Sequence, residues 1–589
     1  MSRAAAAIQN AIALFEGGKA EQAKATLRQT LQRAPQDAQA NKVLAMIHGA
    51  LHEDEQAYVF IARAALAAPN DAEIQFMLGN VCTILRRYKD GVRAYTAAAK
   101  LNPANLEAHD GLGKCLLGLG EYDRSMEAYE AGLRVAPDNP DLYFRMGVSL
   151  ALIGRIDAAL RVAERGLARI PGDASLLEFL AYYRNFADGV DPIAHRDEHA
   201  ALGRTLPAAP AAPFANVRDP ERPLRVAFLS ADFYFHACAF FLLGPLREFD
   251  RARLVPYLYA LPTRDDEFTA RFRTLGEWRD CNGRTPDEIA AMMHADAIDV
   301  VVECCGWTER RVMHAAARRL APVQCTYLGY PNTTGLASVG HRLVDAVTDP
   351  APIADAHCTE RLARLPGCFL CYQPPPEAPA QFDPTPPSAS PGAAGVTFGS
   401  FNRVMKVGPT AVATWARILR EVPGSTLLIK IQVAADEVAP AFAARFAEHG
   451  VDPARIRSAP WSKKPGEHFP NYRLMDIALD SFPYNGTTTT CECTWMGVPV
   501  VALAGDTHRA RVGASLLATL GSPELIAPTP DEYVRIAVDL ARDPARLAAY
   551  HATSRQRMAA SPLVDASGFA RRFEGTLREL WREWCRSGA

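Results

Sequence analysis

The chain has 589 residues, 49% of them hydrophobic, which is too long for one domain of ordinary size and enough to bury several cores. Its 64 Lys and Arg residues nearly balance its 66 Asp and Glu residues, which excludes the charge footprint of a nucleic-acid or acidic-membrane binder. No apolar stretch approaches the length that spans a bilayer. We therefore expect a multidomain cytoplasmic protein with neither nucleic acid nor membrane as partner.

The N-terminal third repeats with a period of thirty-four residues. Prolines recur at this interval, at Pro35, Pro69, Pro103, Pro137 and Pro171. Small residues precede each proline by twelve positions, at Ala23, Ala57, Gly91, Ser125 and Ala159. Others precede it by twenty-four, at Ala11, Ala45, Gly79, Gly113 and Gly147. These features resemble the tetratricopeptide repeat, a helical hairpin that stacks into an α-solenoid.

The resemblance predicts about five repeats over residues 2–171 and a capping helix over 173–185. The concave face of such a solenoid binds extended peptide, so we expect protein or peptide acceptors as partners. The alternative is that the repeats only scaffold the protein or form a homodimer.

The rest of the chain alternates strand and helix patterns in two halves. Strand patterns occupy 224–229, 298–303, 322–328, 395–401, 426–430, 456–458, 477–480 and 498–503. Pro-rich stretches at 205–223 and 374–391 interrupt the pattern. The predicted fold is thus α plus α/β, with two Rossmann-like parallel sheets facing a cleft. The expected domains are repeats and cap at 1–190, a linker at 191–223, a first lobe at 224–373, a linker at 374–394 and a second lobe with a closing C-terminal helix at 395–589.

The run from Asn485 to Glu492 combines a turn, four threonines and one carboxylate after a predicted strand. Helix-start amides and threonine hydroxyls at that place suit a pyrophosphate, and Glu492 suits ribose hydroxyls. The alternative, equally compatible with the run alone, is a threonine-capped helix with an acid in its first turn.

Thirteen cysteines lie mostly in apolar runs, which is typical of buried free thiols. Cys368 and Cys371 have metal-ligand spacing but lack a second pair, and Cys491 with Cys493 is a weaker candidate. The chain has no Gly-x-Gly-x-x-Gly, Gly-Lys-Ser/Thr, His-Glu-x-x-His or Asp-x-Asp motif. We therefore expect neither metal nor cofactor. Side chains and backbone amides must then stabilise the negative charge of any leaving group.

Several segments together resemble the O-linked N-acetylglucosamine transferases, which carry tetratricopeptide repeats and have the two-lobed fold called GT-B. The segments are 230–236 (SADFYFH), 306–308 (GWT), 321–324 (APVQ), 328–335 (LGYPNTTG), 401–406 (FNRVMK), 467–468 (EH), 485–492 and 511–515 (RVGAS). The resemblance covers nearly the whole chain and implies a nucleotide-sugar donor.

By this resemblance Lys406 contacts the donor diphosphate, flanked by Asn402 and by Arg403, where the family commonly has Gln. An ammonium at that place stabilises charge on the leaving UDP. The alternative for Lys406 is a solvated helix-start lysine.

The resemblance also implies the base and ribose contacts. His468 corresponds to the histidine that packs on uracil, and Lys464 or Lys463 reaches the polar edge of the base.

Within the threonine run, Thr488 and Thr489 correspond to threonines that bind the diphosphate. Glu492 corresponds to the ribose carboxylate, which is Asp in the animal enzymes, and Thr487 stands where those enzymes carry His.

On the acceptor side, His236 corresponds to a histidine beside the acceptor that can take a hydroxyl proton. The sugar's acetamido group and phosphate oxygens are alternative proton acceptors, and a lone His in an apolar setting is often structural. Tyr330, Pro331, Thr333 and Thr334 are expected to line the acceptor side of the cleft.

The resemblance implies inverting, metal-independent transfer of N-acetylglucosamine from UDP-N-acetylglucosamine to Ser or Thr of proteins. Two alternatives stay open. The same fold serves other donors or acceptors, such as UDP-glucose to Asn or GDP-fucose to Ser/Thr, and a non-catalytic repeat adaptor could retain relic lobes.

Overall fold

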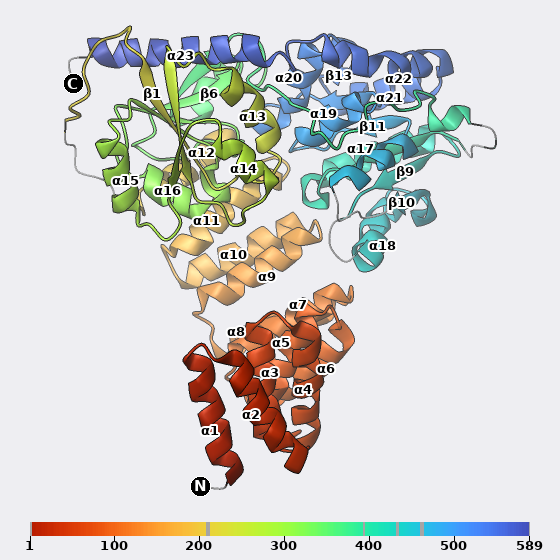
Figure 1. Ribbon diagram of the computed structural model, residues 1–589. Coiled ribbons are helices and arrows are strands. Elements are labelled where there is room, and N and C mark those ends of the chain that lie inside the picture. Colours follow the sequence, from red (N-terminus) through yellow and green to blue (C-terminus); the bar gives the residue numbers. More distant parts are fainter. Residues whose placement is uncertain are drawn as a thin grey trace. The chain divides into compact units, whose positions relative to one another are not determined.

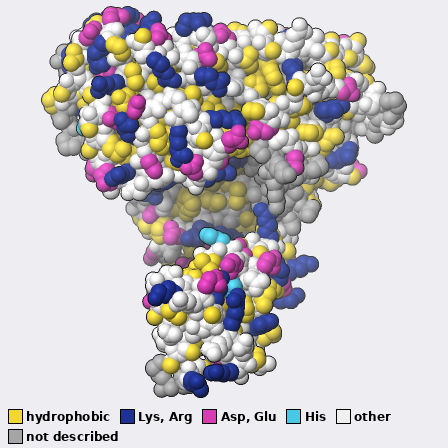
Figure 2. All heavy atoms as spheres, in the orientation of Figure 1, with side chains coloured by type: hydrophobic (Ala, Val, Ile, Leu, Met, Phe, Trp, Pro, Cys, Tyr) yellow, Lys and Arg dark blue, Asp and Glu magenta, His cyan; other side chains and the backbone are white. Residues whose placement is uncertain are grey.

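The computed structural model describes residues 3–207, 213–390, 392, 395–431, 435–459 and 465–587. The chain forms two compact units (Figure 1). The first comprises Met1–Leu176 with Asp436–Ala441, and the second comprises Leu177–Ala435 with Phe442–Ala589. On the face drawn in Figure 2, basic and acidic side chains are interspersed rather than segregated, as the near-neutral composition predicts. In the described part of the chain no helix combines the length and apolarity needed to cross a membrane.

The first unit consists of paired helices with the predicted period. The pairs are α1 (Arg3–Glu16) with α2 (Ala20–Arg33), α3 (Ala38–Ala50) with α4 (Asp54–Ala67), α5 (Ala72–Ile84) with α6 (Tyr88–Leu101), α7 (Leu106–Gly118) with α8 (Tyr122–Val135), and α9 (Pro140–Leu152) with α10 (Ile156–Arg169). The next helix, α11 (Ala174–Tyr183), lies where a capping helix is predicted.

The repeat turns are fixed by side chains. The first helix of each later pair begins at an N-cap whose side chain accepts a backbone N–H, and these caps are Asp37, Asp71, Asn105 and Asn139. Six residues after each repeat proline, a polar side chain donates to that proline's carbonyl. We call these residues the turn donors: Asn41, Gln75, His109 and Tyr143. Each turn thereby satisfies backbone groups that the helix ends leave unpaired.

The small residues let the helices approach closely. A Cβ on Gly79 or Gly111 would lie under 3.0 Å from the ring of Tyr95, and a Cβ on Gly113 would meet Tyr129 in the same way. The last pair has the small Ala163 where the preceding pairs carry Tyr95 and Tyr129, and Tyr143 and Leu176 fill the space beside Gly166.

The second unit holds two parallel sheets, as predicted. The first has the order β3-β2-β1-β4-β5-β6-β7, formed by β1 (Leu224–Ser230), β2 (Leu254–Ala260), β3 (Glu277–Asp280), β4 (Val300–Glu303), β5 (Val323–Thr326), β6 (His341–Asp345) and β7 (Arg361–Leu365). The second has the order β10-β9-β8-β11-β12-β13, formed by β8 (Thr397–Ser400), β9 (Thr426–Ile429), β10 (Ile456–Ser458), β11 (Ile477–Leu479), β12 (Val500–Leu503) and β13 (Ile526–Ala527).

Helices cover both sheets (Figure 1). They are α13 (Ala239–Glu248), α14 (Glu267–Arg273), α15 (Pro286–Ala295), α16 (Arg310–Ala316), α17 (Pro409–Glu421), α18 (Ala435–Ala447), α19 (Thr488–Trp495), α20 (Val512–Thr519), α21 (Pro530–Ala541), α22 (Pro544–Ala559) and α23 (Ala566–Arg586). The strand cores are nearly all apolar, as strands covered on both faces require.

The C-terminal helix α23 returns to the first sheet. Phe573 lies 5.3 Å from the ring of Tyr327 and 6.3 Å from that of Phe228, and Trp581 donates to the carbonyl of Asp219. Each large apolar side chain buried there contributes about 1.5–3 kcal/mol. The closing helix predicted for the second lobe therefore packs on the first lobe.

The segment 191–223, expected as a linker, begins with α12 (Pro192–Gly203). Asp191 caps this helix and Pro192 occupies its first turn. An Asp followed by Pro is a typical signal for the start of a helix, and the prediction of a linker did not take it into account. The helix packs into the first lobe, where the His199 ring lies 2.7 Å from the Tyr330 hydroxyl. Part of the expected linker is therefore structural.

Candidate active site

The second unit contains a cavity of about 540 Å³ lined by loops from both lobes. Loops after β1 and β5 supply Asp232, His236 and Leu328, and loops after β8 and β11 supply Lys406 and Thr488. All of these loops follow the carboxyl ends of parallel strands, which is where open α/β sheets bind ligands. The predicted residues His236 and Lys406 thus meet in one cavity.

Lys406 is held over an aromatic ring at the cavity wall. Its Nζ donates to the carbonyl of Asn485 at 3.0 Å and lies 3.9 Å from the ring centroid of Tyr484. Burial lowers the pKa of Lys406 to about 7, Asp480 opposes the shift, and Arg403 adds to it. A diphosphate entering the cavity would supply the negative charge that this ammonium lacks.

The buried carboxylate of Asp480 holds loops of the second lobe together through hydrogen bonds. Its Oδ1 accepts the backbone N–H groups of Gly486 and Ser481 and the amide of Asn402, while Oδ2 has no hydrogen-bond partner among the described residues. Burial raises the pKa of Asp480 to about 7, against the effects of Gly486 and Lys406. Asp480 was not predicted as a site residue, although an acid directly after an apolar strand often marks the ligand-binding end of a parallel sheet.

The threonine run opens helix α19 at the cavity. Thr487 occupies the N-cap position without a side-chain cap bond, so the capped-helix alternative does not describe this run. Thr487, Thr488 and Thr489 line the cavity, and the Thr489 hydroxyl donates to Asn402 Oδ1 at 2.9 Å. A Cβ on Gly486 would lie 2.4 Å from that hydroxyl, so only glycine fits. The first amides of α19 and the hydroxyls of Thr487 and Thr488 therefore stay available to an anion.

Glu492 lies in the second turn of α19 rather than the first, and it does not border the 540 Å³ cavity. Its Oε2 accepts from the Tyr472 hydroxyl and lies 3.1 Å from Nε2 of His468, while Oε1 accepts no bond from a described residue. Burial raises the pKa of Glu492 to about 7, with Tyr472 and Lys430 opposing the shift. Burial also lowers the pKa of His468 to about 4, so its ring is neutral. The two predicted donor residues are therefore adjacent.

The other predicted donor residues differ in exposure. Asn402 is buried and holds Thr489, whereas Arg403 is exposed at the cavity. The predicted base contact, Lys464 or Lys463, lies outside the described residues.

The predicted acceptor-side turn is not at the cavity surface. Tyr330, Thr333 and Thr334 are buried, and Leu328 and Gly329 line the cavity instead. The Tyr330 hydroxyl accepts from Asn185, and Thr333 and Thr334 both donate to Glu360.

Pro331 borders a separate small cavity with His195 and His508. The turn is thus a structural joint that packs under α11 and α12, and the expectation that its side chains line the cleft is wrong.

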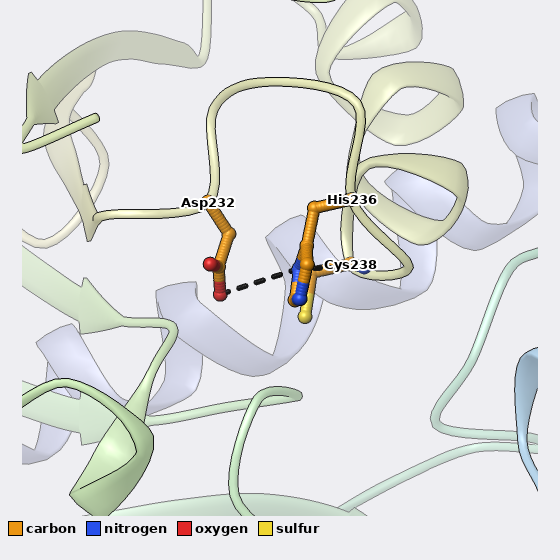
Figure 3. A group of neighbouring side chains, drawn as sticks. All are labelled: Asp232, His236 and Cys238. Carbon is orange, nitrogen blue, oxygen red and sulfur yellow. Dashed lines mark hydrogen bonds and ion pairs between the residues drawn. The ribbon is translucent and has the colours of Figure 1, made fainter. Parts of the chain in front are cut away.

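On the first lobe, Asp232 and His236 form a pair beside Cys238 (Figure 3). Asp232 Oδ2 lies 3.5 Å from His236 Nδ1, and the Cys238 amide donates to the same nitrogen at 3.4 Å. Burial lowers the pKa of His236, Asp232 opposes the shift, and Arg403 and Arg264 add to it. A neutral imidazole at the cavity can accept a proton. Asp232 was overlooked in the sequence, where its place four residues before His236 was the available signal.

Fold and site together define a two-lobed α/β protein with a ligand cavity between its lobes and a tetratricopeptide array before them. The family model described as glycosyl transferase family 41 matches residues 193–373 and 390–573, more than half of the chain. The chain therefore belongs to glycosyl transferase family 41. Tetratricopeptide models match residues 11–37 and 85–142, which confirms the predicted repeats.

Relatives and one solved structure agree with this assignment. Proteins named "Probable UDP-N-acetylglucosamine--peptide N-acetylglucosaminyltransferase SPINDLY" are 39% identical over 399 residues in Arabidopsis thaliana and 40% identical over 376 in Petunia hybrida. The matches cover 67% and 63% of this chain but only 43% and 40% of those relatives. A mutant of Thermobaculum terrenum O-GlcNAc transferase superposes with a TM-score of 0.76 and 27% identity, covering 88% of this chain and 98% of that one. The predicted two-lobed fold is confirmed.

Proposed function

We propose that this protein transfers N-acetylglucosamine from UDP-N-acetylglucosamine to Ser or Thr of proteins, by an inverting, metal-independent reaction. The observation that carries the proposal is the cavity in which Asp232 and His236 of one lobe face Lys406 and the start of α19 from the other. One wall offers a proton acceptor, and the other offers cationic and amide donors for a diphosphate. The names of the relatives, UDP-N-acetylglucosamine--peptide N-acetylglucosaminyltransferases, support this donor and a peptide acceptor.

In this mechanism neutral His236 accepts the acceptor hydroxyl proton while the oxygen attacks the anomeric carbon. Asp232 stabilises the imidazolium that forms. On the opposite face of the sugar, the Lys406 ammonium and the α19 amides stabilise charge on the departing UDP. Attack and departure on opposite faces invert the anomeric centre.

Protein acceptors are proposed to bind the solenoid, whose repeats form a surface typical of peptide recognition. Homodimer formation and the cytoplasmic location stay predictions.

A second candidate keeps the fold and changes the donor. Arg403 lines the cavity where the family commonly has Gln, and Thr487 lines it where the animal enzymes carry His. Both changes fall beside the predicted diphosphate, so a UDP-glucose or GDP-fucose donor is the alternative to test.

The test is a donor screen. The purified full chain is incubated with labelled UDP-N-acetylglucosamine, UDP-glucose or GDP-fucose and a protein extract, and mass spectrometry then identifies the modified residue and its sugar. UDP and GDP compete in parallel binding assays. The proposal predicts transfer of N-acetylglucosamine to Ser/Thr and preference for UDP. Transfer from GDP-fucose alone would select the second candidate, whereas neither transfer nor nucleotide binding would select the adaptor.

A further inference from the structure

Three side chains of different chemistry converge at the first-lobe wall of the cavity (Figure 3). Asp232, His236 and Cys238 each present one oxygen, nitrogen or sulfur atom, and these atoms lie within 4.8 Å of one another. Asp232 lies two residues after β1 ends, and Cys238 is the N-cap residue of α13, so both ends of the loop that carries them are anchored. The described residues contain no other cluster of this kind.

The spacing is close to that of a tetrahedral metal centre. Zinc bonds of about 2.0–2.3 Å place neighbouring ligand atoms about 3.4 Å apart. The Asp232 Oδ2 to His236 Nδ1 separation of 3.5 Å already has this value. Because all three atoms lie within 4.8 Å of one another, the widest pair needs to close by at most about 1.4 Å, which side-chain rotation can supply.

The ligand types select the metal. Mg²⁺ and Ca²⁺ require mostly oxygen ligands, and this cluster supplies one carboxylate. A thiolate, an imidazole and a carboxylate together favour Zn²⁺. The nearby cations Arg264 and Arg403 oppose any bound cation, and the negative charges of the thiolate and the carboxylate offset this repulsion. The fourth position faces the cavity, which Asp232, His236 and Cys238 all line, so water can complete the shell.

A second thiol stands behind the cluster. Cys305 Sγ lies 3.6 Å from Asp232 Oδ2 and is fully buried. Its thiol donates to the carboxylate and so helps to hold the orientation of Asp232.

We propose that Asp232, His236 and Cys238 form a zinc-binding site whose occupation blocks transfer. As the Zn–S bond forms, the Cys238 thiol proton leaves to solvent. With the metal on Nδ1, the neutral ring keeps its proton on Nε2 and has no free lone pair to accept the acceptor proton. The binding half of this inference needs only the geometry of the cluster, whereas the inhibitory half rests on the proposed function.

The binding test titrates the reduced full chain with Co²⁺ and Zn²⁺. One Co²⁺ per chain is expected, with a thiolate-to-cobalt charge-transfer band and the intense ligand-field absorption of four-coordinate cobalt. Cys238→Ser should abolish the charge-transfer band and weaken Zn²⁺ at least about tenfold, and Asp232→Asn should weaken Zn²⁺ while keeping the band. Cys281→Ser, a buried thiol of the same lobe, is the matched control and should change neither. Thermal unfolding verifies that each variant folds. An unchanged band in Cys238→Ser, or no binding to the wild-type chain, overturns the proposal.

The activity test compares each protein with its own zinc-free rate. Zn²⁺ should inhibit the wild-type chain and the Cys281→Ser control, EDTA should restore both, and Cys238→Ser should resist at least tenfold more Zn²⁺. Zinc that binds without inhibiting overturns the inhibitory half. Metal binding is measured without any nucleotide sugar. The binding result therefore stands even if the protein proves not to be a transferase.

Discussion

The tetratricopeptide unit and the two-sheet unit use buried polar groups in different ways. In the repeats each turn donor bonds a carbonyl six residues away, and the contact recurs every thirty-four residues. At the cavity of the two-sheet unit the contacts occur once and join distant segments, as when Lys406 donates to Asn485, 79 residues on. Local contacts that recur stabilise the repeats, whereas unique buried charges hold a site ready for a ligand. Substitutions should therefore separate stability from function by region.

The largest expected effect is that of Lys406→Ala. Losing the ammonium that meets the leaving diphosphate should lower the transfer rate on the order of 100- to 1,000-fold. Folding should change little, because the lowered pKa shows that burial opposes the charge. Steady-state kinetics and UDP calorimetry measure the effect, with the exposed Lys89→Ala in α6 as control. Undiminished activity would remove Lys406 from the mechanism.

Glu492→Gln should have the next largest effect. The change keeps the shape of the side chain and removes a buried charge that would accept ribose hydroxyls, so UDP affinity should fall about 10- to 100-fold, or about 1.5–3 kcal/mol. Calorimetry with UDP measures it, and exposed Glu448→Gln is the control. If the UDP affinity is unchanged while the melting temperature drops, the role of Glu492 is only to hold Tyr472 and His468 in place.

A smaller effect is expected from pH. Because burial lowers the pKa of Lys406 to about 7, the free protein increasingly holds a neutral amine above that pH. Binding a diphosphate then requires proton uptake, so UDP affinity should fall by up to about tenfold per pH unit. Glu492 also titrates near 7 and acts in the opposite sense, since its ionised form accepts the ribose, so the measurement uses Glu492→Gln.

Calorimetry in buffers of different ionisation enthalpy counts the protons taken up. Adding Lys406→Ala to the same background should flatten the profile. A persisting slope would assign the titration to another group, such as Asp480.

The features that were predictable from the sequence are those with a local signature. The repeat period gave the paired helices, and the apolar runs gave strands such as β1 and β10 to within a residue. Lys406 and the threonine run were found because they belong to contiguous segments that follow strands.

What could not be predicted depends on residues far apart in the chain. Tyr330 was assigned to the cleft, yet it is buried because Asn185, 145 residues away, donates to its hydroxyl. In the same way Glu492 reaches Tyr472 and His468 instead of acting at a helix start. Such contacts follow from packing between elements, which no local pattern contains.

The smallest expected effect lies in the repeats and concerns the N-caps of their helices. The first helix of a pair can have a side-chain cap that the second helix lacks. Asn139 caps α9 with its side chain, whereas Arg155 at the start of α10 makes no cap bond. Asn139→Ala should therefore cost about 1 kcal/mol of unfolding free energy, and Arg155→Ala should stay within about 0.5 kcal/mol. Urea unfolding of the full chain measures both, and UDP affinity should be unchanged in each variant. A loss of UDP affinity in Asn139→Ala would show that the repeats and the donor site are energetically coupled, which the contrast between local and unique contacts does not allow.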